Sequence, residues 1–242
     1  DITYYGLIGQ KEVNISKDRK TLHIDAGYYC EEGDNCDTLA IPEPEYVDLG
    51  LSVKWATFNV GANAPEDYGD YFAWGETEPK EEYTWENYKW CDGTSTNMTK
   101  YNDTDGLITL LPEDDAATVN WGDKWRMPTK LECQELIDNC TWEWTTLNGV
   151  NGYKVTGTNN NYIFLPEAAY KYYQYNKTGG SYWPANGKKQ MAHTMRFVPN
   201  QKTRIIDGYK CCGVPIRPVY NETPEPCLVV KVNDTLSINM VY

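Results

Sequence analysis

The chain has 242 residues, 40% of them hydrophobic, which suits one large domain or one domain with a small appendage. Its formal net charge of −13 argues against nucleic acid as a partner, because phosphate backbones would be repelled. No stretch approaches the roughly 18 consecutive apolar residues of a membrane-spanning helix, so we expect no transmembrane segment. No basic and apolar leader precedes the first residues, and we expect a mature or trimmed product.

The first 40 residues predict a short N-terminal β appendage. An alternating stretch from Thr21 to Ala26 is typical of a strand, and a Pro-rich link follows at residues 41–45. From Tyr46 to Gly61, short apolar runs bounded by glycines predict two short strands or one bent strand. These strands open the main predicted domain, residues 41–220.

A long loop is predicted for residues 65–105, where aromatic residues recur without a helical period. Such a loop needs internal packing, and Trp74, Trp85 and Trp90 are the expected anchors. The chain has nine Trp and twenty Tyr but four Phe, which favours rings with a polar group. These rings suit binding faces, and the alternative is that they are packing anchors alone.

Two helices are predicted next. Pro112 begins a short helix to Val119, with acidic residues in its first turn. From Thr129 to Cys140 the sequence combines a capping box, made by Thr129 and Glu132, with an apolar stripe.

After Trp144 the pattern is β. Strands are predicted at residues 153–156, 162–165, 194–198 and 216–220, with turns at Asn148-Gly149 and Asn151-Gly152. Residues 221–242 predict a C-terminal β hairpin that completes or flanks the domain. Few helices and many short strands indicate the α+β class.

Eight cysteines without paired CxxC spacing favour disulfides in an oxidising compartment, and hence an extracellular or cell-surface location. Cys133 is expected to be a free core thiol. Vicinal cysteines pair badly, because a disulfide needs Cα atoms about 5.5 Å apart and neighbours are about 3.8 Å apart. One of the vicinal pair is therefore expected to bond elsewhere, for example to Cys227. The disulfide candidates are Cys30, Cys36, Cys91, Cys140, Cys211, Cys212 and Cys227.

Several motifs, in order along residues 46–220, resemble the Fibrobacter succinogenes major paralogous domain family, which is abundant in surface proteins of gut Bacteroidota. The motifs are residues 46–57 (YVDLGLSVKWAT), 68–77 (YGDYFAWGET), 113–117 (EDDAA), 125–129 (WRMPT), 149–153 (GVNGY), 163–166 (IFLP) and 216–219 (IRPV).

This resemblance implies a C-type-lectin-like fold with two helices, short antiparallel strands and long irregular aromatic-rich loops. It also implies a relation to formylglycine-generating enzymes and to the variable proteins of diversity-generating retroelements. In such proteins the binding residues lie between a Tyr-Trp pair, here Tyr182-Trp183, and a terminal Arg-Pro-Val strand, here residues 217–219. The implied binding segment is residues 181–213. The chain departs from the usual Tyr-Trp-Ser-Ser at Pro184-Ala185, and Cys211-Cys212 replaces the paired tyrosines often found there.

The same segment is locally basic in an acidic chain, which favours an anionic ligand or partner, and the alternative is a solvated loop with incidental charges. Tyrosines at 170–175 add rings that could stack on sugars or pack at a protein interface. The predicted ligand-binding residues are Tyr172, Tyr173, Tyr175, Tyr182, Trp183, Lys188, Gln190, Met191, His193, Arg196, Lys202, Arg204, Asp207 and Tyr209.

No catalytic residues are predicted, since the two histidines, His23 and His193, belong to no metal or nucleophile motif. No cofactor is expected, and calcium is the alternative, with oxygen ligands at Asp114, Asp115, Asn120 and Asp123.

We therefore expect a secreted or surface-displayed adhesion protein that binds a protein or glycan receptor on a host or bacterial surface, as part of a larger surface assembly. A pilus-tip adhesin and a retroelement-diversified variable protein are its two forms. The alternatives are a phage tail-fibre receptor-binding tip and a cysteine oxidase like the formylglycine-generating enzymes, which needs Cys211 or Cys212 reduced and accessible.

Overall fold

The computed structural model describes residues 4–5, 12–15, 22–24, 44–172, 175–176, 179–221, 230–232 and 235–237. The chain divides into two compact units, Asp1–Pro42 and Glu43–Tyr242. In the first unit, β1 (Tyr4–Tyr5), β2 (Glu12–Ile15) and β3 (Leu22–Ile24) form an antiparallel sheet. Strand β3 confirms the strand predicted at residues 21–26.

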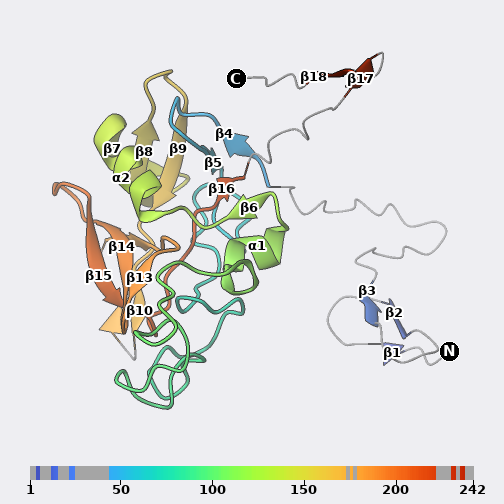
Figure 1. The fold of residues 1–242 in the computed structure, drawn as a ribbon. Helices are drawn as coiled ribbons and strands as arrows, with labels where there is room; N and C mark the ends of the chain where they lie inside the picture. The colour runs from blue at the N-terminus through green and yellow to red at the C-terminus, as the bar shows by residue number, and fades with distance from the viewer. Residues whose placement is uncertain are drawn as a thin grey trace. The chain divides into compact units, whose positions relative to one another are not determined.

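The second unit is mixed, with a few short helices and many antiparallel strands in small sheets, and is broadly α+β (Figure 1). One four-stranded sheet has the order β4 (Tyr46–Val47), β5 (Lys54–Ala56), β16 (Val219–Tyr220) and β6 (Trp125–Arg126), and a three-stranded sheet has the order β7 (Thr141–Leu147), β8 (Val150–Thr156) and β9 (Tyr162–Pro166). A second four-stranded sheet has the order β12 (Gly180–Tyr182), β14 (Met191–Phe197) and β13 (Gly187–Lys188), and β15 (Arg204–Tyr209) also pairs with β14. The described residues also form two strand pairs, β10 (Lys171–Tyr172) with β11 (Tyr175–Asn176), and β17 (Val230–Val232) with β18 (Thr235–Ser237). The last pair confirms a hairpin within residues 221–242.

Helix α2 (Lys130–Asn139) forms as the capping box predicts. The Thr129 side chain accepts a hydrogen bond from the Glu132 amide, and the Glu132 carboxylate accepts one from the Thr129 amide. One face, with Cys133, Leu136 and Ile137, is buried against the sheet strands, while Leu131 is exposed. The amphipathic stripe therefore decides which face of the helix meets the core.

The shorter predicted helix is divided at Asp115. A 3-10 turn, η1 (Pro112–Asp114), precedes α1 (Ala116–Trp121), and Asp115 is the N-cap of α1. Its buried carboxylate accepts hydrogen bonds from the amides of Ala117, Thr118 and Met127. Burial raises the pKa of Asp115, although these amides favour the ionised form.

The predicted turn at Asn148-Gly149 is confirmed, but the second predicted turn is wrong. Asn148 and Gly149 have φ values of 46° and 85° and join β7 to β8 in a two-residue hairpin. Asn151 and Gly152 instead lie inside β8. A Cβ at Gly152 would lie 2.4 Å from the Leu165 carbonyl oxygen, so this glycine permits close strand approach rather than a turn.

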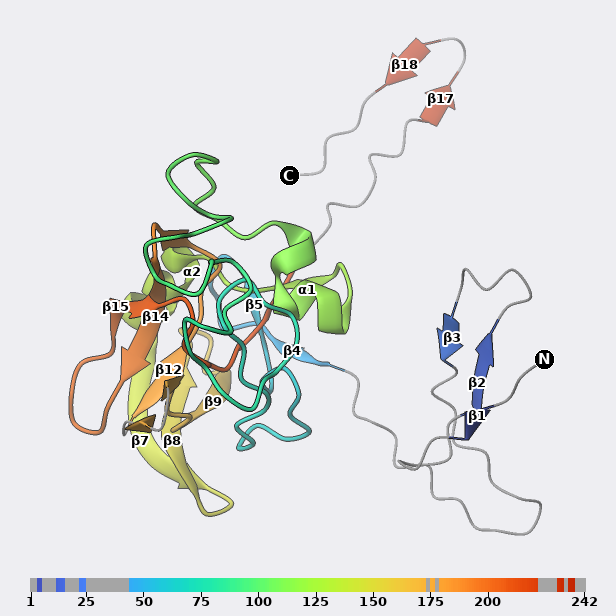
Figure 2. The same ribbon diagram turned by 90° about the horizontal axis from the view of Figure 1, so that it is seen from below.

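Two main apolar cores lie on either side of the β12–β14 sheet. One core joins α2 to the β7–β9 sheet and β5 through residues such as Trp55, Leu136 and Phe197 (Figures 1 and 2). The other gathers residues such as Phe72, Trp74 and Trp183. Successive strand residues point to opposite faces, which separates Tyr182, in the first core, from Trp183, in the second.

Arg217 connects distant parts of the unit from a fully buried position. Its guanidinium donates to Asn59 Oδ1 at 2.8 Å, to the carbonyl oxygens of Ala56 and Thr57 at 3.1 and 2.7 Å, and to that of Phe164 at 2.9 Å. Burial lowers the pKa of Arg217 to about 10. The side chain thus ties β5, the chain after it, and β9 to the segment that leads into β16.

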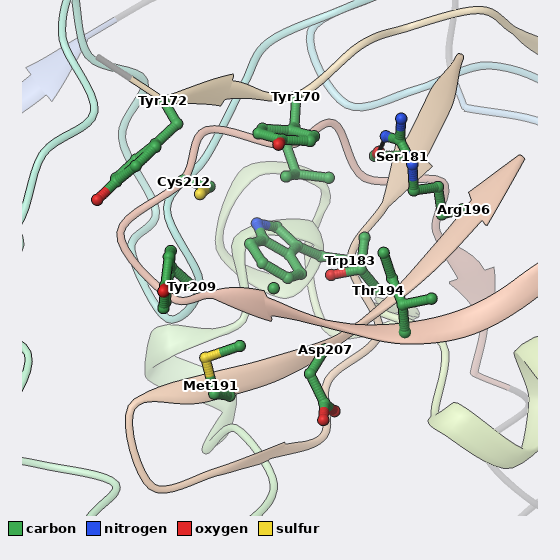
Figure 3. Close-up of a pocket in the computed structure, with 13 residues that line it drawn as sticks. Tyr170, Tyr172, Ser181, Trp183, Met191, Thr194, Arg196, Asp207, Tyr209 and Cys212 are labelled. Atoms are coloured by element: carbon green, nitrogen blue, oxygen red, sulfur yellow. Dashed lines mark hydrogen bonds between the residues drawn. The ribbon is translucent and has the colours of Figure 1, made fainter. Parts of the chain in front are cut away.

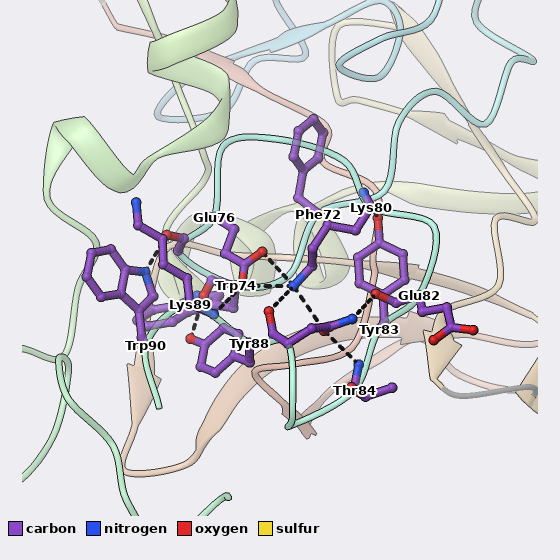
Figure 4. A network of polar contacts seen from close by, with 12 residues as sticks. Phe72, Trp74, Glu76, Lys80, Glu82, Tyr83, Thr84, Tyr88, Lys89 and Trp90 are labelled. Carbon is purple, nitrogen blue, oxygen red and sulfur yellow. Dashed lines mark hydrogen bonds and ion pairs between the residues drawn. The ribbon is translucent and has the colours of Figure 1, made fainter. Parts of the chain in front are cut away.

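Residues 57–111 carry no helix or named strand, yet they are held by specific polar contacts, as predicted for a loop with internal packing. Trp74 and Trp85 are buried and Trp90 packs against the same clusters, so all three predicted anchors are confirmed. Figure 4 shows the Lys80 ammonium bonded to the Glu76 carboxylate. The same ammonium donates to the backbone and side-chain oxygens of Asn87. Trp90 Nε1 donates to the Gly75 carbonyl oxygen at 2.6 Å.

Lys210 is a second buried cation. Its Nζ donates to the Tyr101 carbonyl oxygen at 3.0 Å and lies 4.5 Å from the centroid of the Trp74 ring. Burial lowers the pKa of Lys210 to about 8, against the attraction of Asp105. The loop region therefore encloses a positive charge between aromatic rings.

Candidate functional site

A pocket of about 450 Å³ opens beside the β14–β15 hairpin. Figure 3 shows Trp183 in the middle of the lining, with Tyr172 and Tyr209 on one side and Arg196 with Ser181 on the other. This volume lies in the range of about 300–1,000 Å³ that is typical of small-ligand sites. The lining residues are Tyr170, Tyr172, Ser181, Trp183, Met191, Thr194, Arg196, Ile206, Asp207, Gly208, Tyr209, Cys212 and Val214.

Small residues on the two hairpin strands make room for the pocket. Gly208 of β15 pairs with Ala192 of β14, so neither strand carries a large side chain there. A Cβ at Gly208 would lie 2.6 Å from Thr194 Oγ1 and 3.2 Å from the Trp183 ring. The absence of a side chain at Gly208 therefore allows these two residues to lie close under the strand.

Trp183 and Thr194 form the buried part of the lining. Trp183 is 1% exposed, and its Nε1 donates to the Phe72 carbonyl oxygen at 2.9 Å, which fixes the ring. The buried Oγ1 of Thr194 has no hydrogen-bond partner among the residues that the structure describes. A buried hydroxyl without a hydrogen-bond partner lowers the stability of the fold. Thr194 therefore leaves an unused hydrogen-bonding group in the pocket lining.

Tyrosine rings form the more open wall. Tyr209 is 44% exposed, and its ring centroid lies 5.7 Å from that of Tyr172 and 5.9 Å from that of Trp85. Trp85 belongs to a buried cluster with Tyr88 and Cys211, so the long loop supports this wall from behind. Rings that are fixed at one edge and open at the other are suited to contact a ligand at little entropic cost.

Two charged residues lie in the lining, at different places. Arg196 donates from Nη1 to Ser181 Oγ at 3.1 Å, and its guanidinium carbon lies 5.5 Å from the Tyr170 ring centroid. Asp207 pairs with Lys188 Nζ at 2.8 Å and with His193 Nδ1 at 3.2 Å.

The Asp207 cluster has a defined charge state at neutral pH. The hydrogen bond from Lys188 lowers the pKa of Asp207, so this carboxylate stays ionised. Burial and the nearby Lys130 lower the pKa of His193, although Asp207 opposes them, so His193 is neutral at pH 7.

Six of the predicted ligand-binding residues meet in this one pocket, although they span almost forty residues of sequence. They are Tyr172, Trp183, Met191, Arg196, Asp207 and Tyr209. Sequence reasoning missed Thr194 and Gly208, which carry no chemical signal by themselves. Only the pairing of β14 with β15 shows that they lie under the pocket.

Several other predicted residues lie elsewhere. The prediction for Tyr182 is corrected, because this side chain is 1% exposed and its hydroxyl bonds Asn59 and the Pro166 carbonyl in the core. Lys188 and His193 reach the site only through Asp207. The remaining predicted residues are Gln190, which lines a separate depression; Lys202 and Arg204, which line another with Arg196; and Tyr173 and the side chain of Tyr175, which lie outside the described residues.

The disulfide prediction is corrected for Cys91, Cys140, Cys211 and Cys212, which are free thiols, while Cys30, Cys36 and Cys227 lie outside the described residues. Cys91 and Cys140 pack against different clusters, and the two vicinal cysteines are too close in sequence to pair. Cys133 is free and buried, as expected.

The vicinal thiols lack the features of a reactive cysteine. Both are buried, and the hydrogen bond to Cys212, together with burial, raises the pKa of Cys211. A reactive cysteine needs the opposite shift.

The carboxylates proposed for calcium have other partners. Asp114 accepts hydrogen bonds from Lys100 Nζ and the Tyr101 hydroxyl, and Asp115 caps α1. Within the described part of the chain, no group of three or more His, Cys, Asp or Glu residues is arranged to hold a metal ion.

No family model, curated protein or solved structure matches the chain. None of the helices that the structure describes is long and apolar enough to cross a membrane.

Proposed function

We propose that this protein is the ligand-binding module of a secreted or surface-displayed adhesion protein, and that it binds its receptor in the pocket beside the β14–β15 hairpin. The observation that carries this proposal is the convergence of six residues, chosen as binding residues from sequence alone, on a single aromatic pocket. Aromatic anchors at a concave site, with few charges, are typical of recognition surfaces.

The proposal includes a C-type-lectin-like fold, which is supported by the sequence resemblance of residues 46–220. In that fold class the binding segment precedes the last strand of the domain. Here the pocket residues from Ser181 to Val214 precede β16, and a long aromatic loop lies behind them. This order is the one that the resemblance implies.

Binding is favoured over cysteine oxidation by the state of the vicinal cysteines. An oxidase would need an accessible thiolate at Cys211 or Cys212, whereas Cys211 is fully buried with a raised pKa, and Cys212, although it lines the pocket, is only 5% exposed. An adhesin and a phage tail-fibre tip share the binding role, and the same receptor assay applies to both.

Truncation of the open wall tests the site. We expect Tyr209→Ala to weaken binding to a cell-surface or glycan array about tenfold or more, as for a ring that anchors an interface. Tyr162→Ala is the matched control, because Tyr162 is 55% exposed and does not line the pocket. Thermal melting of both variants checks that they fold. Equal binding by the two variants would place the receptor site elsewhere.

A second variant reduces the pocket volume without removing a ring or a charge. We expect Gly208→Val to abolish array binding, since a Cβ at this position already meets Thr194 and Trp183. Thermal melting of Gly208→Val beside the wild type checks that this variant folds. Retained binding by a folded Gly208→Val protein contradicts the pocket assignment.

A further inference from the structure

The pocket lining holds one cation and one anion, Arg196 and Asp207. Asp207 is already paired with Lys188 Nζ at 2.8 Å and with His193 Nδ1 at 3.2 Å, and its carboxylate points away from Trp183 (Figure 3). The positive charge of Arg196 therefore favours an anionic group on the ligand.

Arg196 is held in a fixed position beside the pocket. Ser181, which is fully buried, accepts its hydrogen bond at 3.1 Å, and the Tyr170 ring lies 5.5 Å from the guanidinium carbon. A planar guanidinium matches the two oxygens of a carboxylate, and a side chain already ordered loses less entropy on binding. These features favour a carboxylate at this end of the pocket.

The rest of the lining suits a ring with both C–H and O–H groups. Tyr172 and Tyr209 lie across Trp183 from Arg196 (Figure 3), with ring centroids 5.7 Å apart. The C–H face of a pyranose can lie on such rings. Thr194 Oγ1 in the lining, which has no hydrogen-bond partner among the described residues, can pair with a sugar hydroxyl group. A volume of about 450 Å³ leaves room for a ligand of this size.

We propose that the pocket binds an acidic sugar, with the carboxylate at Arg196 and the pyranose ring against Tyr172 and Tyr209. This inference rests on the proposed function, because it assigns the ligand class of the same site. It differs from that function in requiring a charge on the ligand.

The test uses matched sugars on the full chain. Methyl β-glucuronide and N-acetylneuraminic acid are the acidic probes, and methyl β-glucoside is the neutral counterpart of the first, with affinities measured by titration calorimetry. We expect at least one acidic probe to bind about tenfold or more tightly than the neutral glucoside, as a charge-assisted contact requires.

Arg196→Gln should then weaken binding of the acidic probe about 10- to 100-fold and leave the neutral sugar unaffected. Arg204→Gln is the matched control: Arg204 pairs with Arg196 across β14 and β15, and it does not line this pocket. Arg196→Lys should restore part of the affinity, since the charge remains but the paired donors are lost.

The outcomes separate the two proposals. Equal binding of glucuronide and glucoside, or failure of both acidic probes to bind at millimolar concentration, overturns the acidic-sugar assignment and leaves the pocket as the receptor site. If Arg204→Gln weakens binding of the acidic probe and Arg196→Gln does not, the carboxylate contact lies on another surface, and the assignment to Arg196 is overturned. Insensitivity of array binding to Tyr209→Ala overturns the proposed function itself.

Discussion

The region around α2 and the loop region of residues 57–111 reach order by different means. Around α2, strand ladders satisfy the backbone, and apolar side chains such as Leu136 and Val155 fill the space between helix and sheet. The loop region has isolated bridges, such as that between Phe72 and Val214, in place of such ladders. There the side chains also bond the backbone: Trp74 Nε1 donates to the Pro184 carbonyl, and the Tyr88 hydroxyl donates to the Trp74 carbonyl at 2.7 Å.

This difference gives a physical reason for the excess of Trp and Tyr over Phe. Phe would fill the same volume but leave buried carbonyl groups without donors. The loop region also supports Tyr209 through Trp85, so the shape of the pocket wall depends on these polar contacts. Substitutions in each region therefore have different expected costs.

The substitution with the largest expected effect removes the Arg217 side chain, which joins the two regions. Arg217→Met leaves Asn59, in the loop region, and the Phe164 carbonyl, in β9, without their donor. We expect a loss of about 3–5 kcal/mol in the free energy of unfolding, measured by denaturant titration. Arg204→Met, at an exposed site, controls for the loss of charge. A cost no larger than that of the control contradicts the role of Arg217 as a connection.

The next effect concerns the cation enclosed by the loop region. Lys210 has a pKa of about 8 in the folded protein against 10.5 when unperturbed, so the unfolded state binds more protons between these values. The contribution of Lys210 to stability therefore rises with pH across this window, by about 3 kcal/mol.

Buried thiols act in the opposite direction, since burial raises the pKa of Cys140 to about 11, and their contribution falls over part of the same window. The measurement is therefore the difference in unfolding free energy between wild type and Lys210→Met from pH 7 to pH 10.5. We expect this difference to move in favour of the wild type as pH rises. Parallel curves would show that Lys210 titrates normally.

The smallest effect compares one hydroxyl in each region. Tyr88→Phe should cost about 1–2 kcal/mol, because the Trp74 carbonyl loses a buried donor at 2.7 Å. Tyr153→Phe should cost less, because the Tyr153 hydroxyl lies 3.4 Å from the Val198 carbonyl oxygen, beyond a good hydrogen-bond distance, and its other backbone partner, Asn200, is exposed and can bond water instead. Equal costs in thermal melts would remove the distinction between the regions.

The sequence predicted those parts of the fold that local rules govern. The capping box and stripe of α2 and the Asn148-Gly149 hairpin depend on neighbours in sequence, and both were found. Gly152 was misread as a turn because its reason is the Leu165 carbonyl across the sheet. The contacts of the long loop could not be derived, since they join residues such as Trp74 and Pro184 over more than a hundred positions.

The site shows the same limit. Chemical signals such as the rings of Tyr172 and Tyr209 and the charge of Arg196 marked residues that do line the pocket. Tyr182 was wrongly included because a Tyr-Trp pair does not show which ring faces the core until strand alternation is fixed. Gly208 was omitted because its contribution is the space that it leaves.

The sheet that contains β4, β5 and β16 also determines how the domain responds to pulling. The chain enters at β4 and leaves at β16, and both strands are antiparallel to β5. Tyr46 pairs with Ala56 at one end of β5, and Tyr220 pairs with Lys54 at the other. Tension through β4 and β16 therefore runs along their axes and loads the hydrogen bonds on both sides of β5 in shear. In a module that is tethered to a surface and pulled by its receptor, the tension would run along β4 and β16.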